Sequence, residues 1–167
     1  MSFTVREERE SDLPGVSALR DQALTEHQRF LLPPDAAPEH LDTFDAVWHH
    51  PEAKFLVAEE NGQVVGRIGW LAFDAPSGGD SSMGKAAEAF ALFVAPANRE
   101  GPAAGALLTG VELAAKAAGM AMVELGVEDW LADAVALLDR TGYARCGPPR
   151  TVEDWRLSSQ WVYRKSL

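Results

Sequence analysis

The stretch Phe93–Leu108, FVAPANREGPAAGALL, most constrains the fold, because it joins a buried strand to a helix of small residues through a short loop. The run that leads into it, Glu88–Val94, is almost wholly apolar after its first residue, which is typical of a central strand covered on both faces. Pro96 ends this strand, and the helix begins after Gly101. We therefore expect a strand, a tight loop and a helix at the centre of an α/β protein.

Strands and helices are also indicated on either side of this unit. Two β-rich runs flank Asn61-Gly62, a dipeptide that accepts positive φ in a tight hairpin turn. The other expected elements are a strand at Phe3–Arg6, a helix capped by Ser11 and Asp12, a helix from about Glu39 to about Trp48, a strand in MAMVELGV, a helix in ADAVALLDRTGY, a short strand around Tyr143–Cys146 and a last strand in RLSSQWVYRKSL. The predicted order is β-α-α-β-β-β-α-β-α-β-β. We interpret Asp74–Lys85 as a flexible hairpin loop and PPRTVEDW as a turn-rich segment.

Composition argues against several classes of partner. The 167 residues include 15 Lys and Arg against 25 Asp and Glu, a formal net charge of −10. That charge repels nucleic-acid phosphates and anionic membrane surfaces, so we expect neither as a partner. Whether it serves a cationic acceptor or only solubility stays open. The one cysteine, Cys146, cannot build a disulfide framework, which fits a reducing cytoplasm.

The beginning of the helix after Gly101 is a candidate phosphate site. A helix N-terminus leaves several N–H groups unpaired and carries partial positive charge, and both properties suit a pyrophosphate. Small residues allow phosphates to approach the backbone, and Arg99 adds charge. Pro102 has no N–H, so one donor is missing from this turn. The alternative is that Gly101 only begins a helix and the alanines after it only pack.

The order of elements and three motifs together resemble the GNAT superfamily of acetyl-CoA-dependent N-acyltransferases. LVAEENGQVVGRIGW is similar to the second and third strands of that family, LFVAPANREGPAAGALL to its cofactor motif R/Q-x-x-G-x-G/A, and ALLDRTGYAR to its later helix-turn-strand. The resemblance implies an α/β (α+β) fold in one domain over residues 1–167. Its sheet would be mixed and mostly antiparallel, with a splayed strand pair and helices on both faces. Acetyl-CoA would be the acyl donor, without a metal, and a primary amine of a small molecule or peptide the acceptor.

The same resemblance implies which residues hold acetyl-CoA. The main chain of the central strand would pair with the pantetheine arm like an added strand, and a bulge in that strand would open the gap it needs. The diphosphate would lie at the helix start, where Arg99 and Ala104 match the motif and Pro102 replaces its first glycine. The expected cofactor-binding residues are Leu92, Phe93, Val94, Arg99, Glu100, Gly101, Ala103, Ala104 and Gly105.

Glu88 is the expected catalytic base. An acceptor amine is mostly protonated at neutral pH, so some group must accept its proton. Glu88 lies at the start of the central strand and matches a base glutamate of some lysine-acetylating family members, although a solvated glutamate at a strand end is the alternative. Glu124, in another buried strand, is the second candidate. The usual proton-donating tyrosine of the family corresponds here to Leu138, and a nearby asparagine corresponds to Leu131.

Other side chains carry weaker signals. Tyr143 and Cys146 are expected in the core; Tyr163 has no support as an acid. Most tryptophans are expected to pack, although they could line an acceptor pocket. The histidines form no zinc pattern. The tryptophans are Trp48, Trp70, Trp130, Trp155 and Trp161, and the histidines are His27, His40, His49 and His50.

Two questions about function stay open at this point. The departures from the family pattern at Leu138, Leu131 and Pro102 are compatible with a rival function, a catalytically silent acyl-CoA-binding module that regulates a partner. The sequence also leaves open a homodimer formed through the last strands.

Overall fold

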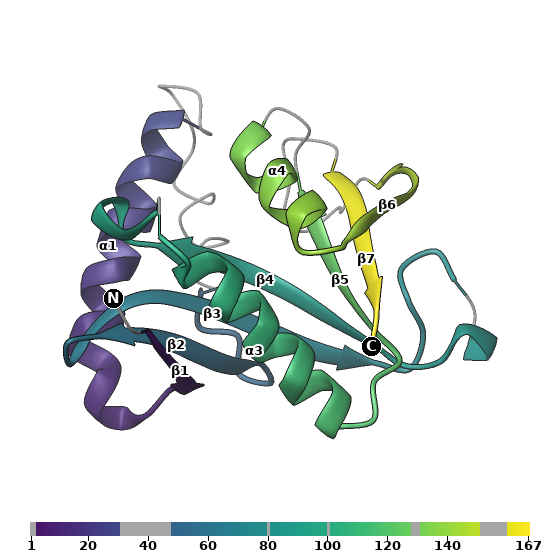
Figure 1. The fold of residues 1–167 in the computed structure, drawn as a ribbon, viewed down its shortest axis with the longest axis horizontal. Helices are drawn as coiled ribbons and strands as arrows, with labels where there is room; N and C mark the ends of the chain where they lie inside the picture. Colours follow the sequence, from purple (N-terminus) through teal and green to yellow (C-terminus); the bar gives the residue numbers. More distant parts are fainter. Residues whose placement is uncertain (1–2, 31–47, 80, 100, 128–130, 151–159) are drawn as a thin grey trace. The chain divides into compact units, whose positions relative to one another are not determined.

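The computed structural model describes residues 3–30, 48–79, 81–99, 101–127, 131–150 and 160–167, and every structural statement below concerns these ranges. Figure 1 follows the chain from its purple N-terminus to its yellow C-terminus. The strands are β1 (Thr4–Glu7), β2 (Lys54–Glu60), β3 (Gln63–Phe73), β4 (Ala86–Val94), β5 (Met122–Val127), β6 (Ala144–Arg150) and β7 (Gln160–Ser166). The α-helices are α1 (Leu13–Phe30), α3 (Ala103–Ala117) and α4 (Ala132–Arg140), and the short 3₁₀ helices are η1 (Glu10–Asp12), η2 (Ser81–Met83) and η3 (Pro96–Asn98). This order agrees with the sequence prediction, except that the helix expected at about Glu39–Trp48 lies, apart from Trp48, outside the described residues.

The described strands form one sheet in the order β1-β2-β3-β4-β5-β7-β6. Pairing is antiparallel for β1 with β2, β5 with β7 and β6 with β7, and parallel for β4 with β5. The predicted mixed, mostly antiparallel sheet is therefore confirmed. The chain divides into two compact units, and each is described by itself. The first unit comprises residues 1–69 and 91–107, and the second comprises residues 70–90 and 108–167.

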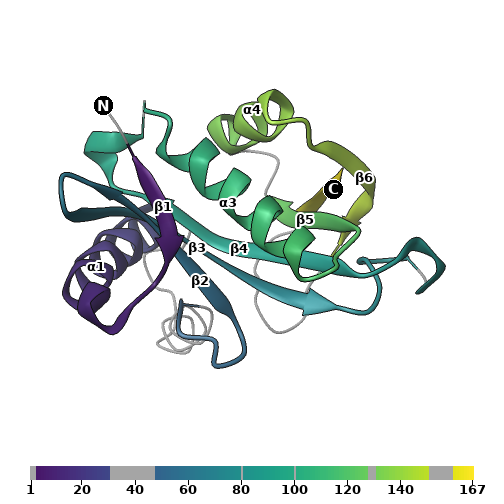
Figure 2. The ribbon, with the colours of Figure 1, turned by 60° about the horizontal axis from the view of Figure 1, so that its bottom comes forward.

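In the first unit, the apolar stripe of α1 packs against strand residues. Leu19 and Ala23 form a buried cluster with Trp48, and the partly buried side chains around it are Val64, Ala91, Phe93 and Ala95. Leu13, the first residue of α1, is 53% exposed. Figure 2 shows β1 beside β2, and their register pairs Thr4 with Glu59.

A buried arginine stabilises the same unit. Arg67 of β3 is 2% exposed, and its guanidinium lies 3.6 Å from the ring centre of Phe55 and 5.0 Å from that of Trp48. Its Nε donates to a Glu8 carboxylate oxygen at 2.6 Å, and its Nη1 donates to the Trp48 carbonyl at 2.6 Å. A buried charge is tolerated when it is paired and hydrogen-bonded in this way.

Positive φ angles occur at the predicted hairpin turn and after two of the helices. Asn61 and Gly62 have φ of 52° and 79°, so the predicted tight hairpin turn between β2 and β3 is confirmed. Gly119 and Gly142, with φ of 79° and 85°, follow α3 and α4 in the left-handed conformation that ends many helices.

The second unit corrects two predictions near the end of the chain. β6 continues to Arg150 and so includes Pro148 and Pro149, which the sequence had placed in a turn-rich segment. β6 is the last strand in the sheet order, where proline is tolerated because one side of the strand needs no ladder hydrogen bond. Cys146 lies on this edge strand and is half-buried, so the expectation that it belongs to the core is wrong.

No helix within the described ranges combines the length and the apolar character needed to cross a membrane.

Candidate functional site

The second half of β4 begins with a backbone kink. Ala91 has φ of 50°, in the left-handed region that residues other than glycine rarely adopt within a strand. Upstream of it, Ala86–Ala89 pair in parallel with Met122–Leu125. A residue in this conformation bends a strand as a bulge does. An irregularity was predicted for this strand, and it lies directly before Leu92–Val94.

The side chains after the kink are buried or half-buried. Val94 is 6% exposed, and Leu92 and Phe93 are half-buried, as expected if only their main chain serves a ligand. The β3 backbone at Gly66 lies close to the β4 backbone at Phe93. A Cβ added to Gly66 would lie 3.2 Å from the Phe93 carbonyl oxygen and 3.0 Å from the Leu107 side chain. The absence of a side chain at Gly66 therefore permits this close approach of β3 to β4.

The first turn of α3 provides a short series of amides. The helical hydrogen bonds begin where the Ala106 N–H donates to the Pro102 carbonyl at 2.9 Å. The first turn, before that bond, contains Ala103, Ala104 and Gly105. The N–H groups in the first turn of a helix have no carbonyl partner within the helix. Pro102 stands just before the helix and contributes its carbonyl to it. The amides of this first turn are those of Ala103, Ala104 and Gly105.

Two glycines near this turn have different surroundings. The Gly101 N–H donates to the Asn98 carbonyl at 3.1 Å, and a Cβ on Gly101 would lie 3.2 Å from that same oxygen, so this glycine closes the loop. A Cβ on Gly105 would meet nothing within 4 Å. A helical glycine costs about 0.5–1 kcal/mol relative to alanine, and packing gives no reason for one here. Open space over the first-turn amides fits a ligand that approaches the backbone. Glu100 lies outside the described residues.

Arg99 is held at both ends of its guanidinium. Its Nε donates to the Val94 carbonyl at 3.1 Å, and its Nη2 donates to Glu26 of α1 at 2.6 Å. The guanidinium also lies 5.1 Å from the ring centre of Phe93. Sequence reasoning missed Glu26, because the two partners are 73 positions apart and nothing local marks the pair.

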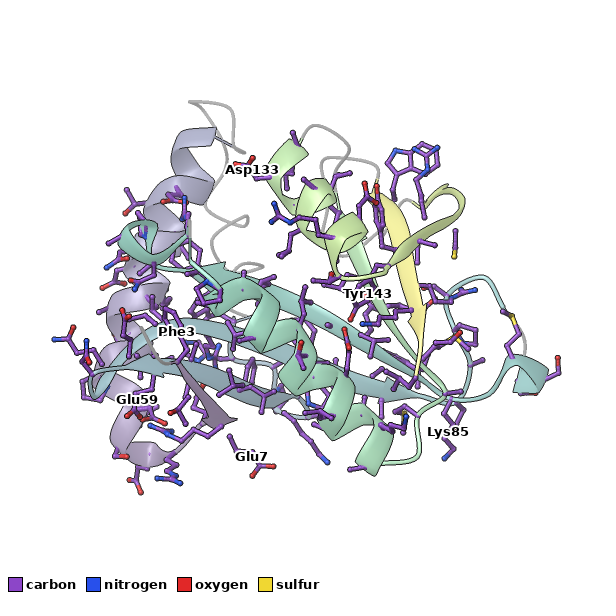
Figure 3. The ribbon with its side chains drawn as sticks, in the orientation of Figure 1. Phe3, Glu7, Glu59, Lys85, Asp133 and Tyr143 are labelled. Atoms are coloured by element: carbon purple, nitrogen blue, oxygen red, sulfur yellow. The ribbon has the colours of Figure 1, made fainter. Side chains whose placement is uncertain are left out.

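A second carboxylate braces the loop before α3. Glu60, at the end of β2, accepts a hydrogen bond from the Asn98 side-chain amide at 2.8 Å. The Asn98 N–H in turn donates to the Ala95 carbonyl at 2.8 Å. Phe3, labelled in Figure 3, would lie 3.7 Å from a Cβ on Gly101. The loop is therefore tied to β2 through Asn98 and Glu60 and to α1 through Arg99 and Glu26.

The two candidate base carboxylates lie opposite each other in the β4–β5 ladder. Glu88 pairs in register with Glu124, so both side chains lie on the same face of the sheet. Glu124 is 2% exposed and accepts hydrogen bonds from Arg164 Nη2 at 2.6 Å and from the Ser77 N–H at 2.7 Å. Glu124 therefore forms an ion pair with Arg164. Glu88 is half-buried.

The Glu124 pair also fixes the connection between β3 and β4. The Ser77 N–H is held by Glu124, and the Ser77 carbonyl accepts from Arg164 Nη2 at 3.2 Å. The connection also contains η2. The prediction of a hairpin is confirmed, since β3 and β4 are neighbours in the sheet. The expected flexibility of the connection stays a prediction.

The positions considered for a proton donor are apolar or buried. Leu138 is 2% exposed, and Leu131 precedes the first residue of α4. Tyr143, labelled in Figure 3, is 3% exposed. Burial raises the pKa of its phenol far above the ordinary value, and the neighbouring Glu112 carboxylate raises that pKa further. A phenol that holds its proton so tightly is a poor acid, and Tyr143 is in the core as predicted. Tyr163 is also buried.

The remaining candidates are accounted for as far as they are described. Trp48 and Trp70 are buried as expected, and Trp161 stacks with Arg145 at 4.0 Å. His49 is exposed, and His50 accepts a hydrogen bond at Nδ1 from the Glu52 N–H. The described residues contain no group of three or more His, Cys, Asp or Glu arranged to hold a metal ion. Trp130, Trp155 and His40, and the side chain of His27, lie outside the description.

Comparison with known families matches residues 19–143, more than half of the chain, to the acetyltransferase (GNAT) family. The chain belongs to the GNAT family. The match extends from α1 to Tyr143, so it includes the kinked β4, the loop that contains Arg99 and the start of α3. The sequence-based identification is therefore confirmed. A search of curated protein sequences finds no match.

Solved GNAT structures share this fold at low sequence identity. An N-acetyltransferase from Staphylococcus aureus Mu50 is 19% identical with a TM-score of 0.69, and the alignment covers 99% of each chain. A ribosomal-protein-alanine N-acetyltransferase from Brucella melitensis is 23% identical with a TM-score of 0.68, covering 98% of this chain and 99% of that one. The PaiA N-acetyltransferase from Thermoplasma acidophilum, solved in complex with coenzyme A, is 15% identical with a TM-score of 0.66 over 100% of both chains.

Proposed function

We propose that this GNAT protein transfers an acetyl group from acetyl-CoA to a primary amine of a small molecule or peptide. The observation that carries the proposal is the run from Ala91 to Gly105, in which a kinked strand leads into three first-turn amides beside a helical glycine with open space. A GNAT protein of the same fold was solved in complex with coenzyme A, which supports a coenzyme site of this kind.

The residues present fit coenzyme A. The main chain of Leu92, Phe93 and Val94 would hold the pantetheine arm. The amides of Ala103, Ala104 and Gly105 would donate to the diphosphate, with Arg99 as the nearby cation. Gly101 would shape the turn, since its own N–H is already bonded to Asn98. Glu100 stays a prediction.

The chemistry assigned to this chain is proton removal. Acetyl-CoA supplies a thioester, a good acyl donor. Glu88 would accept one proton of the protonated acceptor amine. The amine nitrogen then bonds to the acetyl carbon as the carbon–sulfur bond breaks and the thiolate leaves, and the second proton lost from the nitrogen passes to the thiolate or to water. A thiol has an ordinary pKa of about 8.5, so the thiolate can leave without an acid. The leucine at position 138 therefore needs no replacement acid from Tyr143.

A thiol-release assay with acetyl-CoA and a panel of primary amines tests the proposal. Turnover with at least one amine is expected, and Glu88→Gln should reduce kcat by about 10²–10⁴-fold, the usual contribution of a positioned base. Glu52→Gln, which removes the same charge from an exposed turn, should leave kcat unchanged. The loss in Glu88→Gln should shrink at high pH, where the amine loses its proton to solvent. Binding of acetyl-CoA without turnover on any amine would overturn the proposal, and turnover that Glu88→Gln leaves unchanged would overturn the role of Glu88.

Three further features belong to the proposal. We propose that residues 1–167 act as one catalytic domain and that the protein works in the cytoplasm, where acetyl-CoA and reduced thiols coexist. Pairing of two copies through the last strands stays a prediction, to be checked by sedimentation.

A further inference from the structure

In the first unit, Arg99, in the loop before α3, already has a carboxylate partner. Arg99 Nη2 donates to Glu26 Oε2 at 2.6 Å, while its Nε donates to the Val94 carbonyl at 3.1 Å. The two side chains of the ion pair are 44% and 31% exposed, for Arg99 and Glu26 respectively. A ligand at the helix start would therefore meet an arginine whose outer nitrogen already binds a carboxylate.

We propose that Glu26 competes with the diphosphate of coenzyme A for Arg99, and that this competition lowers the affinity of the protein for the coenzyme. The inference rests on the proposed coenzyme site. In the free protein Glu26 occupies the outer end of the guanidinium. In the complex the phosphate takes that end, and Glu26 turns to solvent.

The geometry makes this exchange easy. An exposed ion pair contributes little to stability, because water and salt screen it and two long side chains lose freedom in forming it. The other contacts of Arg99 need not change, since its Nε bonds to Val94 and its guanidinium lies against Phe93. Only the hydrogen bond from Nη2 to Glu26 must be exchanged for one to the phosphate. The planar fork of arginine matches phosphate as well as it matches carboxylate.

Because Glu26 lies on α1, the exchange would also change how α1 is tied to the loop before α3. Glu26 joins α1 to the loop before α3 through Arg99, so release of Arg99 removes that tie between the two segments. Coupling between sites is reciprocal. A coenzyme that displaces Glu26 frees the end of α1, and anything that engages Glu26 elsewhere tightens the binding of the coenzyme.

Calorimetric titration with coenzyme A tests the exchange in a double-mutant cycle. Glu26→Gln should bind about two- to five-fold more tightly than the wild type at low salt, the range expected for an exposed pair. Asp21→Asn removes the same charge from the same helix and is the control for general electrostatics; its residue is 70% exposed and pairs with Arg20. Arg99→Gln should weaken binding. In the Arg99→Gln background, Glu26→Gln should give no more than the Asp21→Asn effect.

Each outcome decides the proposal. An affinity of Glu26→Gln equal to that of Asp21→Asn, or weaker than that of the wild type, overturns it. An undiminished gain in the Arg99→Gln background also overturns it, because the effect would not pass through Arg99. If coenzyme A binds the wild type and only the Glu26 effect is missing, the competition alone is wrong. If coenzyme A binds no variant, the coenzyme site itself is wrong, and the competition with it.

Discussion

Gly105→Ala should raise the stability of the protein and lower its affinity for coenzyme A. Gly105 lies in the first turn of α3, has no positive φ, and a Cβ there would meet nothing within 4 Å. Alanine should therefore stabilise the free protein by about 0.4–1 kcal/mol, through the lower entropy of the unfolded chain. For a chain of this size, that corresponds to a rise in Tm of about 1–4 °C.

The same methyl group would lie over the first-turn amides. If phosphate oxygens approach those amides, the added Cβ must hold them away, and at least one hydrogen bond to a charged group weakens. Such a bond contributes about 1.5–3 kcal/mol, so the Kd for coenzyme A should rise about 10- to 100-fold.

Thermal denaturation of the free protein and calorimetric titration with coenzyme A measure the two effects. Gly15→Ala, in α1, is the matched control. It makes the same chemical change, but its Cβ would lie 3.0 Å from the Val64 Cβ, so it should gain less stability and leave the affinity unchanged. A stabilised Gly105→Ala protein with unchanged affinity would refute the assignment of the helix start to the diphosphate.

Three further predictions concern other parts of the structure. Pro102→Gly restores an N–H just before α3 and should tighten coenzyme A binding in calorimetry; an unchanged affinity counts against the site. Glu124→Leu leaves Arg164 without its buried partner and should cost about 3–5 kcal/mol in urea denaturation, while Glu124→Leu/Arg164→Met should recover much of that loss; a single-variant cost below about 1 kcal/mol contradicts the structural role. The hydrogen bond from Arg6 holds the pKa of Asp12 below its ordinary value, so Asp12 stabilises the fold at neutral pH, and this contribution is lost as the pH falls below about 4 through the lowered folded-state pKa. Acid denaturation should therefore be less steep in Asp12→Asn, and an unaltered pH dependence argues against that contribution.

The sequence predicted the elements whose signals are local. Period-two and helical patterns placed the strands and helices, and Asn61-Gly62 placed the hairpin turn, because each depends on neighbours in the chain. β6 was predicted too short, since whether a strand can hold Pro148 and Pro149 depends on its being at an edge. That position is a property of the whole sheet.

The contacts of the site could not be predicted in the same way. Arg99 was identified from its motif, but its partner Glu26 is remote in sequence, and no pattern joins them. The sequence indicated that Glu124 is a buried carboxylate. Its structural role depends on Arg164 and on the backbone of Ser77, which are remote in sequence and come near Glu124 only in the folded protein. The occupation of the Gly101 amide likewise depends on the local loop geometry.

Amide NMR of the first turn of α3 during titration with coenzyme A tests the central claim most directly. The account predicts that the signals of Ala103, Ala104 and Gly105 move, with saturation at the same concentration as the calorimetric binding. Signals of Gly62, in the β2–β3 turn, should stay in place. Binding that leaves the three first-turn amides unmoved would contradict the account.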